Sequence, residues 1–469
     1  MAFGTSRKGR RKPASKRGAK TIEIIEFSFV RVLLISTYEL GRQPFGLASP
    51  AAWLAKDGHL VDCVDISLDP LTDEQIRQSD VACLHLPMHT ATRLAIPVIE
   101  RIRRVNPGAR LCCFGLYAPL NADLLRDLGV HSILGGEFEA ELVRFVGGGP
   151  PQTLISLERL AFQVPDRSGL PSLKRYPALR HGKARKVAGY VEASRGCKHL
   201  CRHCPVVPVY NGTFRVIPRD IVLADVRGQV AAGAQHISFG DPDFFNGPSH
   251  ATRLVEAMHA EFPDLTYDAT IKIEHLRKHR DLLPVLKATG CLFVISAVES
   301  VDDEILLKLD KGHTKRDFQE TVEDFRRFEL ALSPTFIPFT PWTTPDGFRD
   351  LLRTLRDLDL VAGVSPVQLA LRLLIPHGSR LLELPEIRSM ITGFDELALL
   401  HRWRHSNPAM DNLAAAVLKR VHAEQKRGAS RPAVFRRIWE LADFEEALPE
   451  NFDLIPRAAV PYLDEPWYC

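Results

Sequence analysis

Three cysteines lie within eight residues of this 469-residue chain, and they constrain its fold more than any other feature. Cys197, Cys201 and Cys204 follow a C-x3-C-x2-C spacing, directly after an apolar strand-like run at 187–193. Thiolates at this spacing on a tight loop can converge on one iron–sulfur cluster, whereas a structural zinc site takes four ligands, usually from two paired knuckles. Three thiolates on a four-iron cluster leave one iron open. The spacing therefore predicts a cluster that binds a substrate or cofactor at a strand end.

The other cysteines do not form a disulfide framework. The chain has nine cysteines, an odd number scattered over a long sequence without a secretory signal. Five of them stand in apolar strand-like runs and are interpreted as small buried hydrophobic residues. These five are Cys63, Cys83, Cys112, Cys113 and Cys291.

Composition and charge exclude several protein classes. Apolar residues make up 45% and charged residues 25% of the chain, which is typical of a globular protein with a large core. No apolar run reaches the roughly 18 residues of a membrane span, so we expect a cytoplasmic protein that does not enter a membrane. The net charge of +4 comes from eight Lys or Arg in the first 20 residues. Residues 1–25 are therefore predicted to be a disordered basic tail.

Residues 30–147 alternate strand-like runs with helical stretches, which predicts an α/β fold with an open parallel sheet of the Rossmann type. Ligands of such sheets bind beyond the carboxyl ends of the strands. The expected strands are 31–36, 59–66, 80–86, 109–115 and 130–134, and the expected helices are 47–57, 89–105 and 119–128.

A second strand–helix series at 186–380 suits a partial or complete α/β barrel. A Gly- and Pro-rich linker, expected at 148–185, precedes it. Beyond about residue 381 the pattern is purely helical and predicts a helical cap with the C-terminal tail, at 381–469. The expected barrel strands are 187–193, 235–241, 266–273, 291–298, 334–339 and 366–375, and the helices are 219–232, 248–262, 281–289, 302–310, 314–330 and 345–357.

The cysteine motif at a strand end resembles the radical S-adenosylmethionine (SAM) superfamily, and later segments match that family in the same order. The segment ISFGDPD at 237–243 stands where members end their second barrel strand. VISAVES at 294–300 and KGHT at 311–314 resemble the family's GIES…KGHT stretch, and PHGS at 376–379 resembles its PGT segment. The resemblance implies a radical SAM barrel with a four-iron four-sulfur (4Fe–4S) cluster and SAM as cofactors.

The resemblance also implies roles for individual residues. Cys197, Cys201 and Cys204 would ligate the cluster, whose open iron is chelated by the amino and carboxylate groups of SAM. The carboxylates after Gly240 would hold the SAM amino group, and Glu299 the ribose hydroxyls; these carboxylates are Asp241 and Asp243. Alternatively, Glu299 caps a strand end and Asp241 is a turn residue before a proline.

His203 departs from the family pattern, because members usually place an aromatic residue directly before the third cysteine. An imidazole can still cover the adenine of SAM by stacking, or its ring N–H can bond to a cluster sulfur. The rival interpretation is a zinc site in which His199 or His203 is the fourth ligand. Both histidines could equally be solvated loop residues.

The N-terminal region resembles the cobalamin-binding domains that precede many radical SAM barrels. The similarity rests on FGLA at 45–48, KDGH at 56–59, GGEFE at 135–139 and VPDR at 164–167. The D-x-H-x-x-G signature that supplies an axial histidine to cobalt is absent. Either the domain holds cobalamin without that ligand, or it is a relic lid over the barrel.

The C-terminus, PYLDEPWYC at 461–469, together with the segment at 197–210, is similar to the CUAEP/CCAEP-tail radical SAM proteins. In those proteins a cysteine is followed by selenocysteine or cysteine and then by Ala-Glu-Pro. We hypothesise that the codon after Cys469 is a UGA read as selenocysteine; the alternative is a true terminus. The layout is also similar to the radical SAM enzymes of arsinothricin biosynthesis.

These features predict a radical SAM enzyme, most simply a transferase, that cleaves SAM reductively for group transfer to, or alkylation of, a small molecule. It would need an external one-electron reductant of the flavodoxin or ferredoxin type. The alternatives are a cobalamin-dependent methyltransferase, 3-amino-3-carboxypropyl transfer to arsenite, and a non-enzymatic iron–sulfur or zinc sensor. A tRNA methylthiotransferase is disfavoured, because those enzymes carry further cluster cysteines in the N-terminal domain. A nucleic-acid partner is not expected, since no basic surface interleaved with aromatics is found outside the tail.

Overall fold

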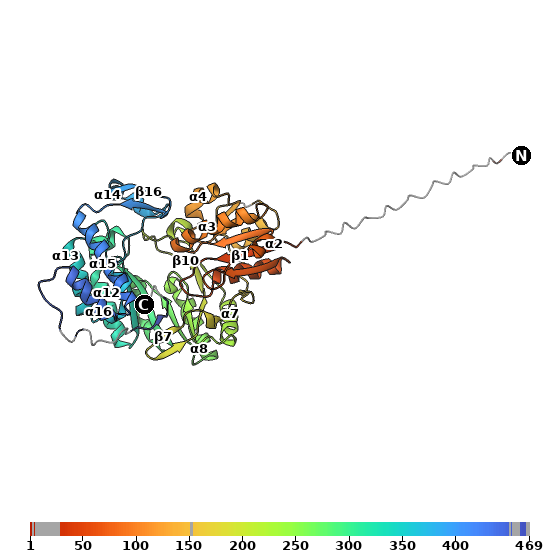
Figure 1. Cartoon of the computed structure of the whole chain (residues 1–469). Helices are drawn as coiled ribbons and strands as arrows, with labels where there is room; N and C mark the ends of the chain where they lie inside the picture. Colours follow the sequence, from red (N-terminus) through yellow and green to blue (C-terminus); the bar gives the residue numbers. More distant parts are fainter. Residues whose placement is uncertain (2–3, 5–28, 151–152, 450–451, 453–459, 466–469) are drawn as a thin grey trace.

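The computed structural model describes residues 1, 4, 29–150, 153–449, 452 and 460–465. Figure 1 shows two α/β bodies side by side, an N-terminal sheet in red to orange and a second sheet in green to teal. The basic tail at 1–25 falls almost entirely outside the described residues, and Cys469 lies outside them as well.

The N-terminal sheet is parallel and has the strand order β2-β1-β3-β4-β5-β6. Its first five strands confirm the five predicted runs. Helices cover both faces, which is why β3 and β5 are buried along their whole length. The strands are β1 (Arg31–Ser36), β2 (Leu60–Asp65), β3 (Val81–His85), β4 (Arg110–Phe114), β5 (Ser132–Gly136) and β6 (Ile155–Ser156). The helices are α1 (Phe45–Lys56), α2 (Asp73–Gln78), α3 (His89–Val105), α4 (Ala122–Asp127) and α5 (Glu139–Val146).

The chain reverses its direction across this sheet between β1 and β3. From β1 it goes outward to β2, then returns to pair β3 with the other edge of β1 before it continues to β4. The connections after β1 and β3 therefore leave the sheet on opposite sides, and a crevice opens at the carboxyl ends of these two strands.

The segment predicted as a linker contains strands of its own. β6 adds a sixth strand to the N-terminal sheet by pairing with β5. β7 (Leu179–His181) and β8 (Ala184–Lys186) form a hairpin, and β18 (Tyr462–Leu463) from the C-terminal end pairs antiparallel with β7. These strands are too short for their periodicity to stand out in the sequence.

The second sheet is also parallel, with the order β15-β14-β13-β12-β9. It forms an open, partial barrel whose helices confirm the six predicted ones and add α9, which was not predicted. The strands are β9 (Ala188–Val191), β12 (His236–Phe239), β13 (Thr266–Thr270), β14 (Cys291–Glu299) and β15 (Ala331–Phe336). The helices are α7 (Arg219–Ala231), α8 (Pro248–Glu261), α9 (Ile273–Lys278), α10 (Leu283–Ala288), α11 (Asp303–Lys308), α12 (Lys315–Arg327) and α13 (Pro345–Asp357).

The predicted sixth barrel strand at 366–375 is wrong. Residues Pro366–Leu369 form a 3₁₀ turn, and only a single bridge joins Arg372 to Phe339. Pro366 stands at the first helical position, where its locked φ and missing N–H favour a helical turn over a strand.

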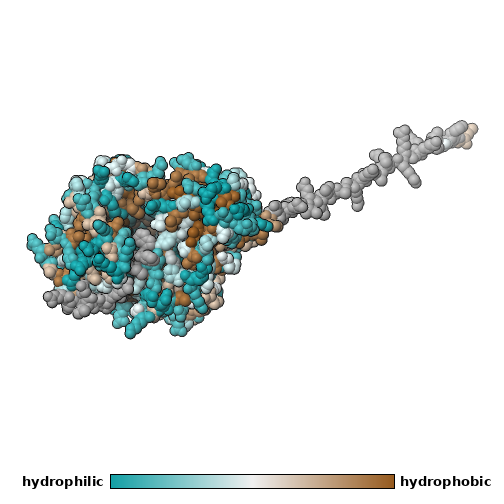
Figure 2. All heavy atoms as spheres, in the orientation of Figure 1, coloured by the Kyte–Doolittle hydropathy of each residue, from teal (hydrophilic) through white to brown (hydrophobic). Residues whose placement is uncertain are grey.

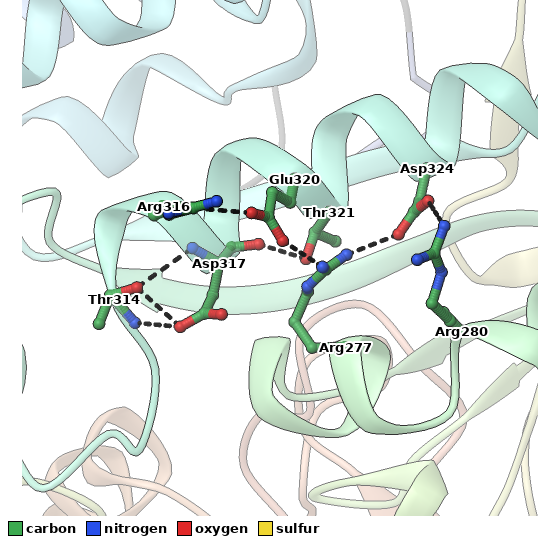
Figure 3. A network of polar contacts seen from close by, with 8 residues as sticks. All are labelled: Arg277, Arg280, Thr314, Arg316, Asp317, Glu320, Thr321 and Asp324. Atoms are coloured by element: carbon green, nitrogen blue, oxygen red, sulfur yellow. Dashed lines mark hydrogen bonds and ion pairs between the residues drawn. The ribbon is translucent and has the colours of Figure 1, made fainter.

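Ion pairs hold α12 against the barrel helices α9 and η4 (Arg280–Leu282), as Figure 3 shows. Asp324 of α12 accepts from Arg277 at 2.6 Å and from Arg280 at 2.9 Å. Thr314 and Asp317 close a capping box at the start of α12, which satisfies its first backbone N–H groups. This network lies on the outer helical layer of the barrel.

The C-terminal region is not purely helical, in contrast to the prediction. β16 (Ile391–Asp395) and β17 (Leu400–Trp403) form an antiparallel hairpin whose turn is closed by Asp395 accepting from two backbone N–H groups. In the turn between β16 and β17, the carbonyl oxygens of Leu397 and Ala398 contact side chains of α3 in the N-terminal domain. The helices here are α14 (Pro385–Met390), α15 (Pro408–Lys426) and α16 (Arg431–Leu441).

Among the described residues, no helix combines the length and apolarity that crossing a membrane requires. Figure 2 shows a largely hydrophilic face, with apolar atoms gathered mainly over the N-terminal sheet. Single exposed leucines such as Leu60 and Leu94 belong to this part of the chain.

Candidate active site

The cysteine loop, residues 197–204, begins at a sharp turn after the short strand β10 (Ser194–Gly196), which pairs with β11 (Phe214–Val216). Gly196 has φ +72°, and a Cβ there would lie 2.4 Å from the carbonyl oxygen of Thr213. Only glycine therefore fits this position. The backbone N–H of Cys197 donates to the same carbonyl at 3.1 Å, which anchors the loop to the hairpin.

The three thiols of the loop share one environment. Cys201 is buried, while Cys197 and Cys204 are half-buried. Burial is the main cause that raises the pKa of Cys204 to about 12, and the neighbouring Cys201 and Cys197 thiols contribute in the same direction. A nearby positive charge is needed to keep such thiols ionised, and metal coordination provides it.

Asp243 lies beside the first cysteine and between two imidazoles. Its Oδ2 is 2.7 Å from Nδ1 of His275 and 3.5 Å from Nε2 of His199. Burial by itself raises the pKa of Asp243, but the two histidines lower it below its usual value. Ligand atoms of Cys197, His199 and Asp243 all lie within 4.8 Å of one another. A single metal ion could bind there.

Asp241 faces away from this group. Its carboxylate accepts from the backbone N–H of Ala193 at 3.0 Å and from the hydroxyl of Ser194 at 2.5 Å. Burial raises its pKa to about 7 despite these two hydrogen bonds. Gly240 is needed beside it, because a Cβ would lie 1.9 Å from the hydroxyl oxygen of Tyr190. Asp241 thus ties the strand end to the start of the cysteine loop.

Glu299, at the end of β14, is held by two positively polarised groups. Its Oε1 lies 3.1 Å from Nε2 of His203 and 3.4 Å from Nζ of Lys311. Burial raises its pKa, but Lys311 and His203 outweigh that effect and lower it to about 2. Glu299 also has φ +69°, a backbone conformation that costs energy in a non-glycine residue. The structure thus joins the predicted residues His203 and Glu299 directly.

A partly open cavity of about 200 Å³ separates the two sheets. It lies at the carboxyl ends of the N-terminal strands and reaches the start of the cysteine loop. Its walls combine aromatic rings, glycines and charged groups. The lining includes Glu39, His85, Phe138, Glu192, Arg195 and Tyr210.

A buried charged network joins the two bodies at this cavity. Arg195, next to the cysteine loop, lies 2.7 Å from Glu139, 2.8 Å from Glu192 and 3.4 Å from Glu137. The pKa of Glu137 is raised to about 7, mainly by burial and also by the neighbouring carboxylates, which together outweigh the lowering effect of Arg195. One guanidinium therefore faces three carboxylates, where a single ionised partner would already balance it.

Sequence reasoning missed the charged residues of the cavity as site residues. Glu39 follows β1, His85 ends β3, Arg195 lies within β10 and the neighbouring Glu137 follows β5, so these four residues belong to no single motif. A rule that marks polar residues after each predicted parallel strand would have collected them.

The cysteines of the N-terminal sheet do not form a second cluster site. Cys83 and Cys112 pair across β3 and β4 and pack toward α1 and α5. Cys113 points into the core on the opposite face of the sheet. Burial raises the pKa of Cys83 and of Cys113 well above the usual thiol value. The prediction that these residues are buried and hydrophobic is confirmed, while Cys63 is only partly buried.

Residues 191–355 match the family model of the radical SAM superfamily domain. Such a domain implies a 4Fe–4S cluster and SAM as its cofactors. The matched range begins at the end of β9 and includes the cysteine loop, Asp243 and Glu299. The C-terminal tail lies outside it.

Curated relatives in sequence are methylthiotransferases. A tRNA-2-methylthio-N(6)-dimethylallyladenosine synthase of Photobacterium profundum is 25% identical over 228 residues, covering 45% of this chain and 48% of that protein. The ribosomal protein uS12 methylthiotransferase RimO of Parabacteroides distasonis is 26% identical over 183 residues, covering 36% of this chain and 41% of that protein. The chain thus spans about half the length, or less, of these relatives.

Solved structures share the fold over most of the chain. The radical SAM methyltransferase TsrM of Kitasatospora setae, with tryptophan and a SAM analogue bound, aligns with TM-score 0.62 and 16% identity, covering 83% of this chain and 89% of that one. The cobalamin-dependent SAM radical enzyme OxsB with aqua-cobalamin bound aligns with TM-score 0.63 and 14% identity, covering 86% and 68%. The mixed α/β arrangement predicted from sequence is therefore that of cobalamin-binding radical SAM enzymes.

Proposed function

We propose that the chain is a radical SAM enzyme that transfers a SAM-derived group to a small molecule, with Cys197, Cys201 and Cys204 as the ligands of its cluster. The observation that carries this proposal is the cysteine loop itself. It presents three neighbouring thiols just beyond the first barrel strand, inside the range that matches the family model. When bound, the cluster supplies the electron that breaks a carbon–sulfur bond of SAM.

We assign the residues around the loop to SAM. Asp243 is a better candidate than Asp241 for the SAM amino group, because its carboxylate lies near Cys197 whereas both oxygens of Asp241 already accept hydrogen bonds. Glu299 is ionised at neutral pH and would accept from ribose hydroxyls, while His203, held by Glu299, would cover the adenine. Gly240 leaves room for Tyr190 behind this segment.

We further propose that the cavity between the two sheets holds cobalamin, which would supply a carrier for the transferred group. The donor set fits the cofactor: the cavity lies at the crevice between β1 and β3 and presents an imidazole and aromatic faces. Its volume of about 200 Å³ is smaller than the 300–1,000 Å³ of ordinary ligand pockets. Cobalamin would therefore bind only if the walls from the two bodies move apart.

The experiment is anaerobic reconstitution of the full chain with iron and sulfide, followed by reduction with flavodoxin or dithionite in the presence of SAM. S-adenosylhomocysteine together with 5′-deoxyadenosine would indicate methyl transfer. Methylthioadenosine would instead indicate transfer of the 3-amino-3-carboxypropyl group. A reduced cluster that leaves SAM intact in the presence of candidate acceptors would contradict the proposed function.

A second candidate is a single-metal site, and the grouping of Cys197, His199 and Asp243 favours it. A cluster holds its thiolates on separate irons, so its ligands stand further apart than those of one ion. Substitutions in the loop distinguish the cluster from the single-ion site. The single-ion site predicts that His199→Ala lowers metal content and Cys204→Ala does not, whereas the cluster predicts the reverse.

We do not extend the methylthiotransferase activity of the sequence relatives to this chain. Those enzymes resemble it over about half their length, and the strand cysteines Cys83, Cys112 and Cys113 point to both faces of the N-terminal sheet. Within the described residues this sheet holds no set of thiols arranged for a second cluster.

A further inference from the structure

The cavity between the two sheets has the size of a small organic molecule. Its volume is about 200 Å³. An apolar protein cavity of about 150 Å³ holds one benzene molecule, so this space has room for about eight non-hydrogen atoms. A corrin is far larger and would need the two bodies to move apart. In the closed arrangement the cavity therefore selects a much smaller ligand.

The cavity reaches the residues assigned to the cluster and to SAM. Ser194 and Gly196 line it just before Cys197, and Pro242 lines it directly before Asp243. The opposite wall comes from strand ends of the N-terminal sheet, which is where open parallel sheets bind their ligands. A molecule held in the cavity would thus lie beside the proposed group-transfer site.

The charged network at this cavity has too few cations for its carboxylates. Arg195 faces Glu137, Glu139 and Glu192. Glu139 is its principal partner, because two guanidinium nitrogens contact that carboxylate, at 2.7 and 2.9 Å. Burial raises the pKa of Glu192, and Arg195 offsets only part of that rise. The guanidinium therefore neutralises one carboxylate, and the network has room for a further positive charge.

Two cations near Glu192 already have carboxylate partners of their own. Arg167 is held by Asp225 through hydrogen bonds of 2.7 and 2.8 Å. His85 lies 2.7 Å from Glu39, which is the other carboxylate of the cavity wall. Glu192 is thus the carboxylate of the wall that a positively charged ligand would neutralise.

The aromatic walls of the cavity also favour a cation. Four rings line it, those of Phe45, Phe138, Tyr190 and Tyr210. The faces of aromatic rings attract positive charge. This surface already holds one cation, since the Arg195 guanidinium lies 5.8 Å from the ring centre of Phe45 and 5.6 Å from that of Phe138. An anion of the same size would face carboxylates instead.

We propose that this cavity binds a small organic ammonium compound of about eight non-hydrogen atoms, with its charge beside the Glu192 carboxylate. Glu192 suits this role because it lines the cavity and its side chain is 22% exposed, whereas those of Glu137 and Glu139 are fully buried. The inference rests on the proposed function and names the class of its small-molecule substrate, a small amine. Binding by itself forms and breaks no covalent bond.

Anaerobic isothermal titration calorimetry of the full reconstituted chain tests this site with three matched probes. Benzylamine is a cation of the expected size, benzyl alcohol is its neutral counterpart, and benzoate is the anion. Saturating SAM is present without a reductant, so that the SAM site is filled and SAM stays intact. We expect benzylamine to bind at least about tenfold more tightly than benzyl alcohol, because its hydrogen bond to Glu192 joins two charged groups. Benzoate should not bind measurably.

Two variants and a larger probe locate the charge and the size limit. Glu192→Gln should weaken benzylamine binding by about tenfold and leave benzyl alcohol binding unchanged, which would show that the cavity is intact. Glu261→Gln is the control, because Glu261 pairs with Arg227 between α8 and α7. It should change neither affinity. Naphthylmethylamine carries the same charge on a larger ring system and should not bind.

The outcomes separate the inference from the proposed function. Equal binding of benzylamine and benzyl alcohol, displacement of benzylamine by SAM, or unchanged benzylamine binding in Glu192→Gln would each overturn the inference. A chain that cleaves SAM on reduction but binds none of the probes would keep the proposed function and overturn the ammonium site. A chain that binds benzylamine but leaves SAM intact on reduction would support the ammonium site and overturn the proposed function.

Discussion

The chain contains two parallel sheets that present polar side chains at their carboxyl ends by different means. In the N-terminal sheet the strand order reverses between β1 and β3, so topology creates the crevice where Glu39 and His85 meet. In the barrel sheet the order runs steadily from β9 to β15, and the chemistry comes from one loop and the strand ends that surround it. A contiguous motif marks the second site, whereas only the fold reveals the first.

The two regions also use cysteine differently. The strand cysteines of the N-terminal sheet fill apolar cores, while the cysteine loop gathers its thiols outside the strands. Burial raises thiol pKa values in both places, so titration alone does not distinguish a ligand from a core residue. The position of a cysteine relative to the strand end does distinguish a ligand from a core residue.

The largest expected effect separates the two kinds of cysteine. Cys201→Ala should remove most bound iron and abolish SAM cleavage, because two thiols do not retain the cluster. Cys113→Ala, the matched control, should keep the iron content and cost only about 1 kcal/mol of stability. Iron and sulfide analysis after reconstitution checks both. Equal iron loss in the two variants would mean that the contrast between loop and strand cysteines is wrong.

The next effect concerns the contact between the two bodies. Arg195→Met leaves three carboxylates buried without their cation, so the free energy of unfolding should fall by about 3–5 kcal/mol. Arg280→Met is the comparison, because Arg280 is about half exposed and Arg277 still pairs with Asp324 (Figure 3); it should cost less than about 1 kcal/mol. Urea unfolding measures both, and similar losses would contradict the special role of the buried network.

The same network predicts a pH dependence. The folded-state pKa of Glu137 is about 7, above its ordinary value of 4.5, so the folded chain binds more protons than the unfolded chain between these values. The contribution of Glu137 to stability should be fully present below about pH 4.5 and be lost as the pH rises through 7, by at most about 3 kcal/mol. Glu137→Gln should reduce the slope without removing it, since Asp241 titrates in the same window. An unchanged slope of stability against pH in that variant would mean that a group other than Glu137 causes the pH dependence.

The smallest effect concerns the C-terminal strand. Tyr38 donates to Glu465 at 2.5 Å and thereby holds β18 against the N-terminal body. Tyr38→Phe should cost about 0.5–1.5 kcal/mol and speed hydrogen exchange of the Asp464 amide, which donates to Ala178. Tyr176→Phe loses a buried hydrogen bond to Asp65 but should leave that amide protected. Equal exchange of the Asp464 amide in both variants would mean that Tyr38 does not hold the strand.

Much of the fold follows from the sequence, because long apolar strands and periodic helices carry strong local signals. The N-terminal strands and most barrel elements lie close to their predicted positions. The failures have local causes. Pro366 turns a strand-like run into a 3₁₀ turn, and the hairpin around Asp395 lacks a clear alternating pattern.

The site was predictable only where a motif is contiguous. The cysteine loop follows from its spacing, and the pairing of His203 with Glu299 required the fold to join a loop with the end of β14. Arg195 and His85 escaped prediction because each is an ordinary polar residue until the two bodies meet.

The most direct test of the proposed enzyme is the spectrum of the reduced cluster in the reconstituted chain, recorded by electron paramagnetic resonance with and without SAM. We predict that SAM shifts the signal, because Cys197, Cys201 and Cys204 leave one iron open for it. A cluster signal that is identical with and without saturating SAM would contradict the radical SAM assignment of this site.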